Sequence, residues 1–204
     1  MMAMVTADAA KSSLYLAHNF LDLSTCLDLM NEAQHAPTTR APVYLEGETD
    51  YVHETVRRTT SFHPPDDWFC GIQNKMMEQK PLLEEHFGHR LTDCERPQFL
   101  HYREGDFFVR HQDGNTEQME FDHLQIRKIS IVVFLNGYSD EPKADTYSGG
   151  ELNFYDKDHE SRTEPLLVSL KGEAGLLVAF KADMLHEVKP VVRGERFTII
   201  SWFR

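Results

Sequence analysis

The fold class is indicated by eight short runs in the second half of the chain: PQFLHY (97–102), DFFVRH (106–111), RKISIVVFLN (127–136), GELNFY (150–155), PLLVSL (165–170), AGLLVAF (174–180), HEVKPVV (186–192) and RFTIISWF (196–203). The runs are rich in β-branched and aromatic residues, and Gly, Asn and Asp separate them. This texture is typical of strands joined by turns, and so many strands in one stretch favour an antiparallel sandwich or barrel. We therefore predict a mainly β fold, a double-stranded β-helix or jelly roll.

The N-terminal part has a different pattern. Leu14 and Leu16 alternate with polar neighbours, which predicts a strand, and apolar residues at helical spacing then predict a helix that ends at Pro37: Cys26, Leu27, Met30 and Ala33. Residues 36–54 are polar without a clear period and are predicted to form a loop.

A second helix is predicted to begin at Pro64–Asp67, because its two aspartates favour the positive end of a helix. Its predicted buried face consists of Trp68, Phe69, Ile72, Met76 and Met77. Pro81 should interrupt this helix, with a short continuation to Phe87. We expect a single domain over residues 1–204, in which about 1–95 form the N-terminal strand and helices and about 96–204 the jelly-roll core.

Composition excludes several classes of protein. The chain has 204 residues, 41% of them hydrophobic, with a formal net charge of -12. The apolar content argues against disorder, and the acidic balance argues against nucleic acid and anionic lipid as partners. Three cysteines fit neither a disulfide framework nor a zinc ribbon. With no signal peptide or membrane-spanning run recognised, we expect a soluble, cytoplasmic protein of unknown oligomeric state.

Three residues form a candidate metal site. His111 is followed by Asp113 two positions later, although chance alone supplies about one such pair in a chain of this composition. The pair ends a predicted strand, where alternate side chains point the same way. A second histidine, His186, begins another strand, and two histidines with one carboxylate are the facial triad of non-haem Fe(II) oxygenases.

Arg196 follows His186 by ten residues, after a turn that contains Gly194. If this turn closes a hairpin, Arg196 lies opposite residues 188–190, within reach of a five-carbon dicarboxylate bound to the metal. An arginine offers a charged fork for the distal carboxylate, and Thr198 on the same strand face adds a hydroxyl donor.

At these residues the sequence resembles the Fe(II)- and 2-oxoglutarate-dependent oxygenases, within them the prolyl-4-hydroxylase-like branch. The resemblance is carried by YREGDFFVRHQDG (102–114), RKISIVVFLN (127–136), SGGELNFY (148–155) and GLLVAFKADMLHEVKPVVRGERFTIISWF (175–203). It implies that His111, Asp113 and His186 bind Fe(II) and that Arg196 binds the C5 carboxylate of 2-oxoglutarate. The implied cosubstrates are 2-oxoglutarate and O₂, with ascorbate as an accessory reductant.

The resemblance also implies roles for Tyr102, near the mouth of the cosubstrate and substrate pocket, and for Trp202, lining that pocket. Both aromatic residues could instead simply fill the barrel. Some prolyl hydroxylases have a tyrosine that binds 2-oxoglutarate where this chain has Phe134, and collagen-type enzymes have lysine in place of Arg196. These departures leave the subfamily open.

The implied activity is hydroxylation of an unactivated C–H group, with a prolyl residue of a protein or peptide as the leading substrate. Alternatives are a free amino acid or small metabolite as substrate, a metal-binding jelly-roll module without catalysis, and a zinc hydrolase. The polar stretches 114–125 and 137–150 are predicted to border the substrate entrance as loops. Arg57 and Arg58 are expected to face solvent.

Overall fold

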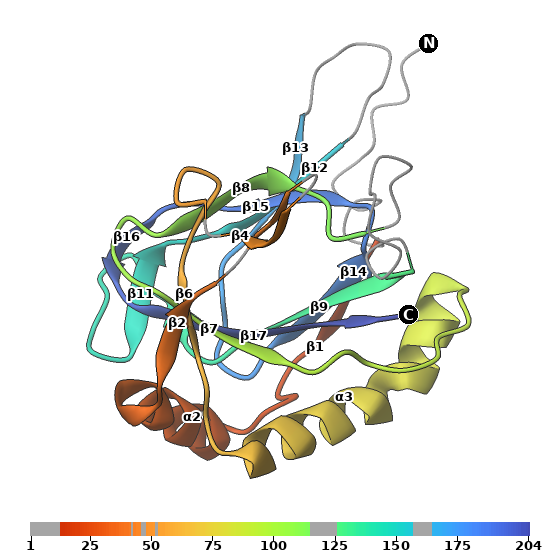
Figure 1. Ribbon diagram of the computed structural model, residues 1–204, viewed down its shortest axis with the longest axis horizontal. Helices are drawn as coiled ribbons and strands as arrows, with labels where there is room; N and C mark the ends of the chain where they lie inside the picture. Colours follow the sequence, from red (N-terminus) through yellow and green to blue (C-terminus); the bar gives the residue numbers. More distant parts are fainter. Residues whose placement is uncertain (1–12, 42, 46–47, 52, 115–125, 157–164) are drawn as a thin grey trace.

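The computed structural model describes residues 13–41, 43–45, 48–51, 53–114, 126–156 and 165–204. Two facing β-sheets form the body of the molecule, and both helices lie against the outer side of the larger sheet (Figure 1). The mainly β, jelly-roll fold class predicted from the sequence is confirmed.

The larger sheet has seven strands in the order β1-β14-β9-β17-β7-β6-β2. Its strands are β1 (Leu14–Ala17), β14 (Leu177–Lys181), β9 (Ile129–Phe134), β17 (Arg196–Phe203), β7 (Gln98–Tyr102), β6 (Thr60–Phe62) and β2 (Thr38–Arg40). All of its pairings are antiparallel. Strands from both ends of the chain thus complete one sheet.

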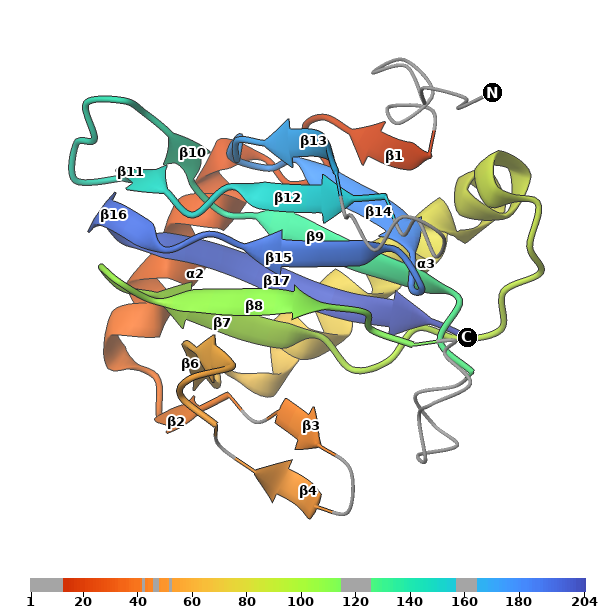
Figure 2. The same cartoon turned by 90° about the horizontal axis from the view of Figure 1, so that it is seen from above.

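The second sheet has five strands in the order β13-β12-β15-β8-β5, and it lies in front of the larger sheet in Figure 2. Its strands are β13 (Leu166–Leu170), β12 (Leu152–Tyr155), β15 (Leu185–Val188), β8 (Phe107–His111) and β5 (Arg57–Arg58). Two small sheets complete the β structure: β10 (Gly137–Tyr138), β11 (Thr146–Gly149) and β16 (Val191–Gly194) form one, and β3 (Val43–Leu45) and β4 (Glu48–Tyr51) form the other.

The first helix, α2 (Leu23–His35), agrees with its predicted position. The Asp22 carboxylate caps it by accepting from the Thr25 amide at 2.8 Å, and the helix ends just before Pro37. Its buried residues are Cys26, Leu29 and Ala33. Leu27 is 48% exposed, so Leu29 takes the place in the core that the spacing had suggested for Leu27.

The predicted interruption of the second helix at Pro81 is wrong. The helix α3 (Asp66–Phe87) runs through Pro81 without a break. Burial of Leu83 one turn from the helix end, together with a Gly88 cap at φ 67°, outweighs the backbone hydrogen bond that proline removes. Tertiary packing here overrides a local breaker.

Two predicted loops contain strands. Residues 36–54 hold β2, β3 and β4, because β2 finds a pairing partner in β6. Residues 137–150 hold β10 and β11, which join β16. Distant strand partners are not visible in a local pattern, so neither pairing was predicted. The other predicted loop, 114–125, lies outside the described residues except for Gly114.

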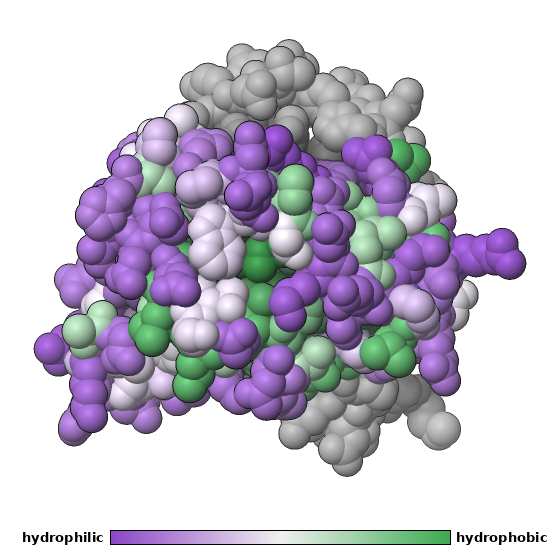
Figure 3. Space-filling model, turned by 90° about the horizontal axis from the view of Figure 1, so that it is seen from below, coloured by the Kyte–Doolittle hydropathy of each residue, from purple (hydrophilic) through white to green (hydrophobic). Residues whose placement is uncertain are grey.

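Strict alternation along the larger sheet separates two apolar clusters. Ile129, Ile131 and Val133 of β9 pack toward the helices, whereas Val132 and Phe134 face the interior between the sheets. The helices' outer sides expose a few leucines among polar residues, and hydrophilic side chains cover most of that face (Figure 3). The sheet is therefore covered on both sides, by helices on one and by the second sheet on the other.

The three cysteines are free thiols, of which Cys26 and Cys94 are buried. Among the described residues, neither helix is sufficiently long and apolar to cross a membrane.

We expect Leu83→Ala to lower the free energy of unfolding by about 2–5 kcal/mol, because it empties a fully buried site beyond Pro81. The neighbouring Leu82 is 48% exposed, so Leu82→Ala should change stability by less than about 0.5 kcal/mol. Urea denaturation followed by circular dichroism measures both. Equal effects of the two substitutions would contradict the packing of the helix end.

Candidate metal centre

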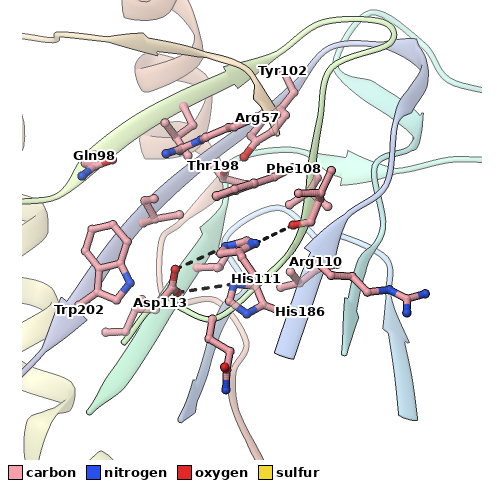
Figure 4. A pocket seen from close by; sticks show the side chains of 18 of the residues that line it. Arg57, Gln98, Tyr102, Phe108, Arg110, His111, Asp113, His186, Thr198 and Trp202 are labelled. Carbon is pink, nitrogen blue, oxygen red and sulfur yellow. Dashed lines mark hydrogen bonds and ion pairs between the residues drawn. The ribbon is translucent and has the colours of Figure 1, made fainter. Parts of the chain in front are cut away.

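Two histidines face each other across the pairing of β8 and β15. His111 ends β8, and its Cα partner in β15 is His186. Asp113 lies two residues beyond His111, where its backbone amide donates to the Ala182 carbonyl at 2.9 Å. The ligand atoms of the three side chains lie within 4.8 Å of one another (Figure 4). The structure therefore brings together the triad predicted from the sequence.

Hydrogen bonds fix the orientation of both imidazoles. Nδ1 of His111 lies 2.8 Å from the Val109 carbonyl, and Nδ1 of His186 lies 2.9 Å from the Met184 carbonyl. A carbonyl oxygen only accepts, so Nδ1 carries the proton and Nε2 is left with a lone pair. Both Nε2 atoms point at the Asp113 carboxylate, at 3.5 and 3.6 Å. A hydrogen bond from Nδ1 to a backbone carbonyl is a usual way of orienting a histidine whose Nε2 binds a metal.

The protonation states suit a metal. Burial, and then the neighbouring His111, lower the pKa of His186 to about 4, so the imidazole is neutral at pH 7. Burial alone would raise the pKa of Asp113, but the two histidines and the Ser130 hydroxyl at 2.7 Å hold it well below its usual range. A cation would displace no proton from either group near neutral pH.

The donor set fits Fe(II). Two imidazole nitrogens and one carboxylate oxygen that lie within 4.8 Å of one another are the donors of the facial triad, and these three residues would hold the ion. The same donors also bind zinc. The surroundings of the triad must therefore distinguish the two chemistries.

The triad opens into a cavity of about 320 Å³ between the two sheets. The cavity wall nearest His111 is aromatic, since the Phe108 ring stacks on the imidazole with 3.6 Å between ring centroids. Apolar side chains from both sheets line much of the rest: Leu100, Val132, Leu152, Val188 and Ile200. The cavity thus has a largely apolar surface between its polar groups and has room for a small ligand together with one side chain.

Arg196 lines this cavity from the larger sheet, but not in the way predicted. The predicted hairpin, in which Arg196 would lie opposite residues 188–190, is wrong. Strand β17 belongs to the other sheet, where Arg196 lies opposite Tyr102 of β7. Twist and sheet exchange in a jelly roll are not visible in the spacing of His186 and Arg196. The guanidinium nevertheless reaches the cavity, across the barrel from β15.

The environment of Arg196 calls for an anion. The residue is 1% exposed, and its Nε and Nη2 atoms have no hydrogen-bond partner among the described residues. Nη1 donates to the Thr198 hydroxyl at 3.4 Å. The ring centroids of Tyr102 and Phe134 each lie 5.0 Å from Cζ of Arg196. A buried guanidinium is costly unless it is paired, so a carboxylate in the cavity fits this site.

Tyr102, Thr198 and Trp202 also line the cavity, as the sequence suggested. Tyr102 belongs to β7, and Thr198 and Trp202 belong to β17. Trp202 packs against Arg127, another residue of the cavity wall, whose guanidinium lies 3.6 Å from the indole centroid and pairs with Glu95 at 2.6 Å. The roles predicted for Tyr102, Thr198 and Trp202 toward 2-oxoglutarate and substrate stay predictions.

Sequence reasoning missed or misplaced other residues. The prediction that Arg57 faces solvent is wrong. This residue is 6% exposed, lines the cavity, and has its Cζ 4.9 Å from the Phe108 ring centroid. Ser130, which binds Asp113, was missed although it is a lone polar residue on the inward side of an apolar strand. Of the 137–150 stretch, no residue lines the cavity.

Of the other histidines near the site in sequence, only His101 lies among the described residues. His101 lies on the other side of its sheet, stacked on Phe197 and 3.1 Å from the Glu195 carboxylate. His123 and His159 lie outside the described residues.

Comparison with curated proteins finds hydroxylases. A PKHD-type hydroxylase of Pseudoalteromonas atlantica is 32% identical over 107 residues, which are 52% of this chain and 41% of that protein. A PKHD-type hydroxylase of Cupriavidus pinatubonensis is 33% identical over 109 residues, 53% of this chain and 42% of that protein. The chain therefore matches less than half the length of these relatives.

Comparison with solved structures finds the same fold over almost the whole chain. A prolyl-4-hydroxylase of Pseudomonas putida has a TM-score of 0.64 at 21% identity and covers 97% of both chains. A prolyl hydroxylase of Trichoplax adhaerens, in complex with a hypoxia inducible factor peptide fragment, has a TM-score of 0.67 at 16% identity, covering 98% of this chain and 87% of that one. At these identities the likeness concerns the fold.

A family model agrees with the site geometry. It matches residues 97–204, more than half of the 204 residues and the whole stretch that carries the triad and Arg196. With a prolyl-hydroxylase-like fold, a matching family model and the donor set of a facial triad, the chain belongs to the 2OG-Fe(II) oxygenase superfamily.

Proposed function

We propose that the protein is an Fe(II)- and 2-oxoglutarate-dependent dioxygenase that hydroxylates an unactivated C–H group. One observation carries the proposal: the same cavity holds the His111, Asp113 and His186 triad and, on the facing sheet, the buried guanidinium of Arg196. A dicarboxylate that chelates iron at one end needs a cation at the other. The triad alone would also suit a zinc hydrolase, but such an enzyme has no evident use for Arg196.

Each side chain has a part in this reaction. His111, Asp113 and His186 would hold Fe(II), which together with 2-oxoglutarate and O₂ supplies the oxidation that gives hydroxylated product, succinate and CO₂. Arg196 would bind the C5 carboxylate of 2-oxoglutarate through its two unpartnered nitrogens. Thr198 hydrogen-bonds Arg196 and offers a further donor.

The cavity walls would position the substrate and exclude water. Phe108 and Leu152 come from the second sheet, and Tyr102 and Trp202 from the larger one. An apolar enclosure limits loss of oxidising equivalents to solvent. Ascorbate would act as an accessory reductant from solution.

We infer a prolyl residue of a protein or peptide as the substrate. The support is that solved prolyl hydroxylases share the fold, one of them with a bound peptide, and that the PKHD-type relatives are named hydroxylases. A cavity of about 320 Å³ is too small for a peptide but accepts one side chain beside the cosubstrate. A pyrrolidine ring matches its apolar lining.

A free amino acid or other small metabolite is the second candidate. The observation in its favour is the buried Arg57 in the cavity wall, which places a cation where a free carboxylate could bind. A residue within a peptide chain has no such carboxylate.

His186→Ala should abolish stoichiometric metal binding and leave the fold intact, because it removes one of three ligand donors. The iron content measured after Fe(II) loading under anaerobic conditions should fall from about one equivalent to near zero. His35→Ala, at an exposed histidine of α2, is the matched control and should keep its iron. Unchanged iron content in His186→Ala and Asp113→Ala would refute the metal centre.

Arg196→Ala should raise the KM for 2-oxoglutarate about 10- to 100-fold, because a charge-assisted pair in a buried site is lost. Succinate formation at varied 2-oxoglutarate concentration measures it. Arg193→Ala, at an exposed arginine of β16, should behave like the wild type. If Arg196→Ala keeps the wild-type KM, the cosubstrate does not bind in this orientation.

The substrate class is tested by mass spectrometry. Iron-loaded protein with 2-oxoglutarate should add one oxygen atom to proline-containing peptides, and omission of Fe(II) should abolish the product. Free amino acids and a small-molecule extract are incubated in parallel. An oxygen gained only by a free metabolite would favour the second candidate and contradict the prolyl-residue proposal, while the oxygenase reaction would stand.

A further inference from the structure

A carboxylate behind the metal centre has no part in the function proposed so far. Glu187 follows His186 in β15, and its side chain is only 13% exposed although it does not line the cavity. Successive side chains of a strand point to opposite faces of the sheet, so Glu187 lies on the face away from the cavity. A charged group with so little exposure is costly unless it is paired. The partners of Glu187 therefore indicate its role.

The two carboxylate oxygens of Glu187 contact different strands. Oε1 accepts from the Tyr155 hydroxyl at 2.5 Å and from Nδ2 of Asn153 at 3.4 Å, and both partners belong to β12. Oε2 lies 3.7 Å from Nε of Arg110, which belongs to β8. Cζ of Arg110 also lies 3.8 Å from the Tyr155 ring centroid. One carboxylate thus connects the strands on both sides of β15.

Strand β8 has one extra residue opposite Glu187. Phe108 and His111 are three positions apart in β8, yet they pair with residues of β15 that are only two positions apart. Val109 and Arg110 therefore both lie opposite Glu187, which makes a β-bulge. In a regular strand, residues three positions apart point to opposite faces. Here Phe108 and His111 both line the cavity, with 3.6 Å between their ring centroids, so the stacking depends on the bulge.

The backbone of the bulge also orients one metal ligand. The Val109 amide donates to the Val56 carbonyl at 2.9 Å, and the Val109 carbonyl lies 2.8 Å from Nδ1 of His111. The other histidine, His186, is oriented by the Met184 carbonyl, which lies outside the bulge. A change in the bulge is therefore expected to disturb His111 and to spare His186.

We propose that Glu187 is a positioning residue for the metal centre: by pairing with Arg110 outside the cavity, it holds the bulge that directs His111 toward the metal. This inference rests on the metal centre of the proposed function. Figure 4 shows that Arg110 extends away from the triad, so neither partner of the pair is placed to be a ligand. An ordinary surface ion pair would contribute little and would not affect the metal.

The first test measures metal affinity. Glu187→Ala should weaken Mn(II) binding about 10-fold in calorimetric titrations, as is typical when a group that supports a metal ligand is removed. Lys189→Ala is the matched control, because Nζ of Lys189 lies 3.6 Å from the same carboxylate but belongs to an exposed side chain beyond the bulge. It should keep the wild-type affinity. Urea denaturation of the metal-free proteins shows whether each variant folds.

A milder variant covers the case in which Glu187→Ala folds poorly. Glu187→Gln keeps the size of the side chain and an oxygen that accepts from Tyr155, but it lacks the charge that attracts Arg110. It should also weaken Mn(II) binding. Adding Arg110→Ala to Glu187→Gln should cause little further loss, because the two residues act as one unit.

A spectroscopic test distinguishes positioning from general stability. Zn(II) binds the same donors and is diamagnetic, so nuclear magnetic resonance of the Zn(II)-loaded protein can follow the Nδ1 protons of His111 and His186. Both should exchange slowly with water in the wild type, because each is hydrogen-bonded to a backbone carbonyl. Glu187→Gln should accelerate exchange at His111 and leave His186 unchanged.

The outcomes separate this inference from the proposed function. Wild-type Mn(II) affinity in the folded Glu187 variants overturns the role of Glu187. Equal acceleration of exchange at both histidines also overturns it, since that result indicates general loosening of the sheet. If His186→Ala loses the metal in the same titration while the Glu187 variants keep it, the metal centre stands and only this inference fails. Failure of the wild-type protein to bind metal would overturn both.

Discussion

The register between β8 and β15 is the constraint on which the site depends. It sets His111 directly opposite His186, and a shift by one residue would turn each imidazole to the other face of the sheet. The Asp113 amide bond to Ala182 and the Ser130 hydrogen bond then hold the carboxylate between the two rings. Because Ser130 belongs to β9 of the larger sheet, one short contact ties the two sheets together at the metal ligands. The position of the triad is therefore a property of the whole sandwich and not of one loop.

Alternation in the larger sheet connects stability to function. Successive residues of β17 point either toward the helices, as Phe197 and Ile199 do, or into the cavity, as Arg196 and Thr198 do. Packing of α2 and α3 on the outer face thus fixes the plane from which the arginine extends. The long helix α3 contributes to this layer on both sides of Pro81, through Met76 and Leu83. Residues far from the cavity hence help to determine where the Arg196 guanidinium lies.

Sequence and structure agree where local signals suffice. Strand periodicity gave the fold class, and the spacing of His111, Asp113 and His186 gave three side chains that the structure brings together. Partners distant in the chain were beyond such reasoning: the β2 and β6 pairing and the sheet exchange of β17 depend on tertiary contacts. Arg57 looked like a surface residue because charge in a polar segment usually is. The division of one domain near residue 95 stays a prediction, although the family match begins at residue 97.

The buried guanidinium that suggests the cosubstrate also affects the folded state. Its Nε and Nη2 atoms lose hydration on folding without compensation from the described residues. A dicarboxylate bound as proposed would form those hydrogen bonds only in the folded state, so its binding would stabilise the fold. The chain as a whole carries a net charge of -12, yet the arginine at the cavity wall gives this interior a local positive potential. An anion bound as proposed would be held there against an unfavourable overall charge, because short-range contacts with a buried guanidinium outweigh screened surface charges at longer distance.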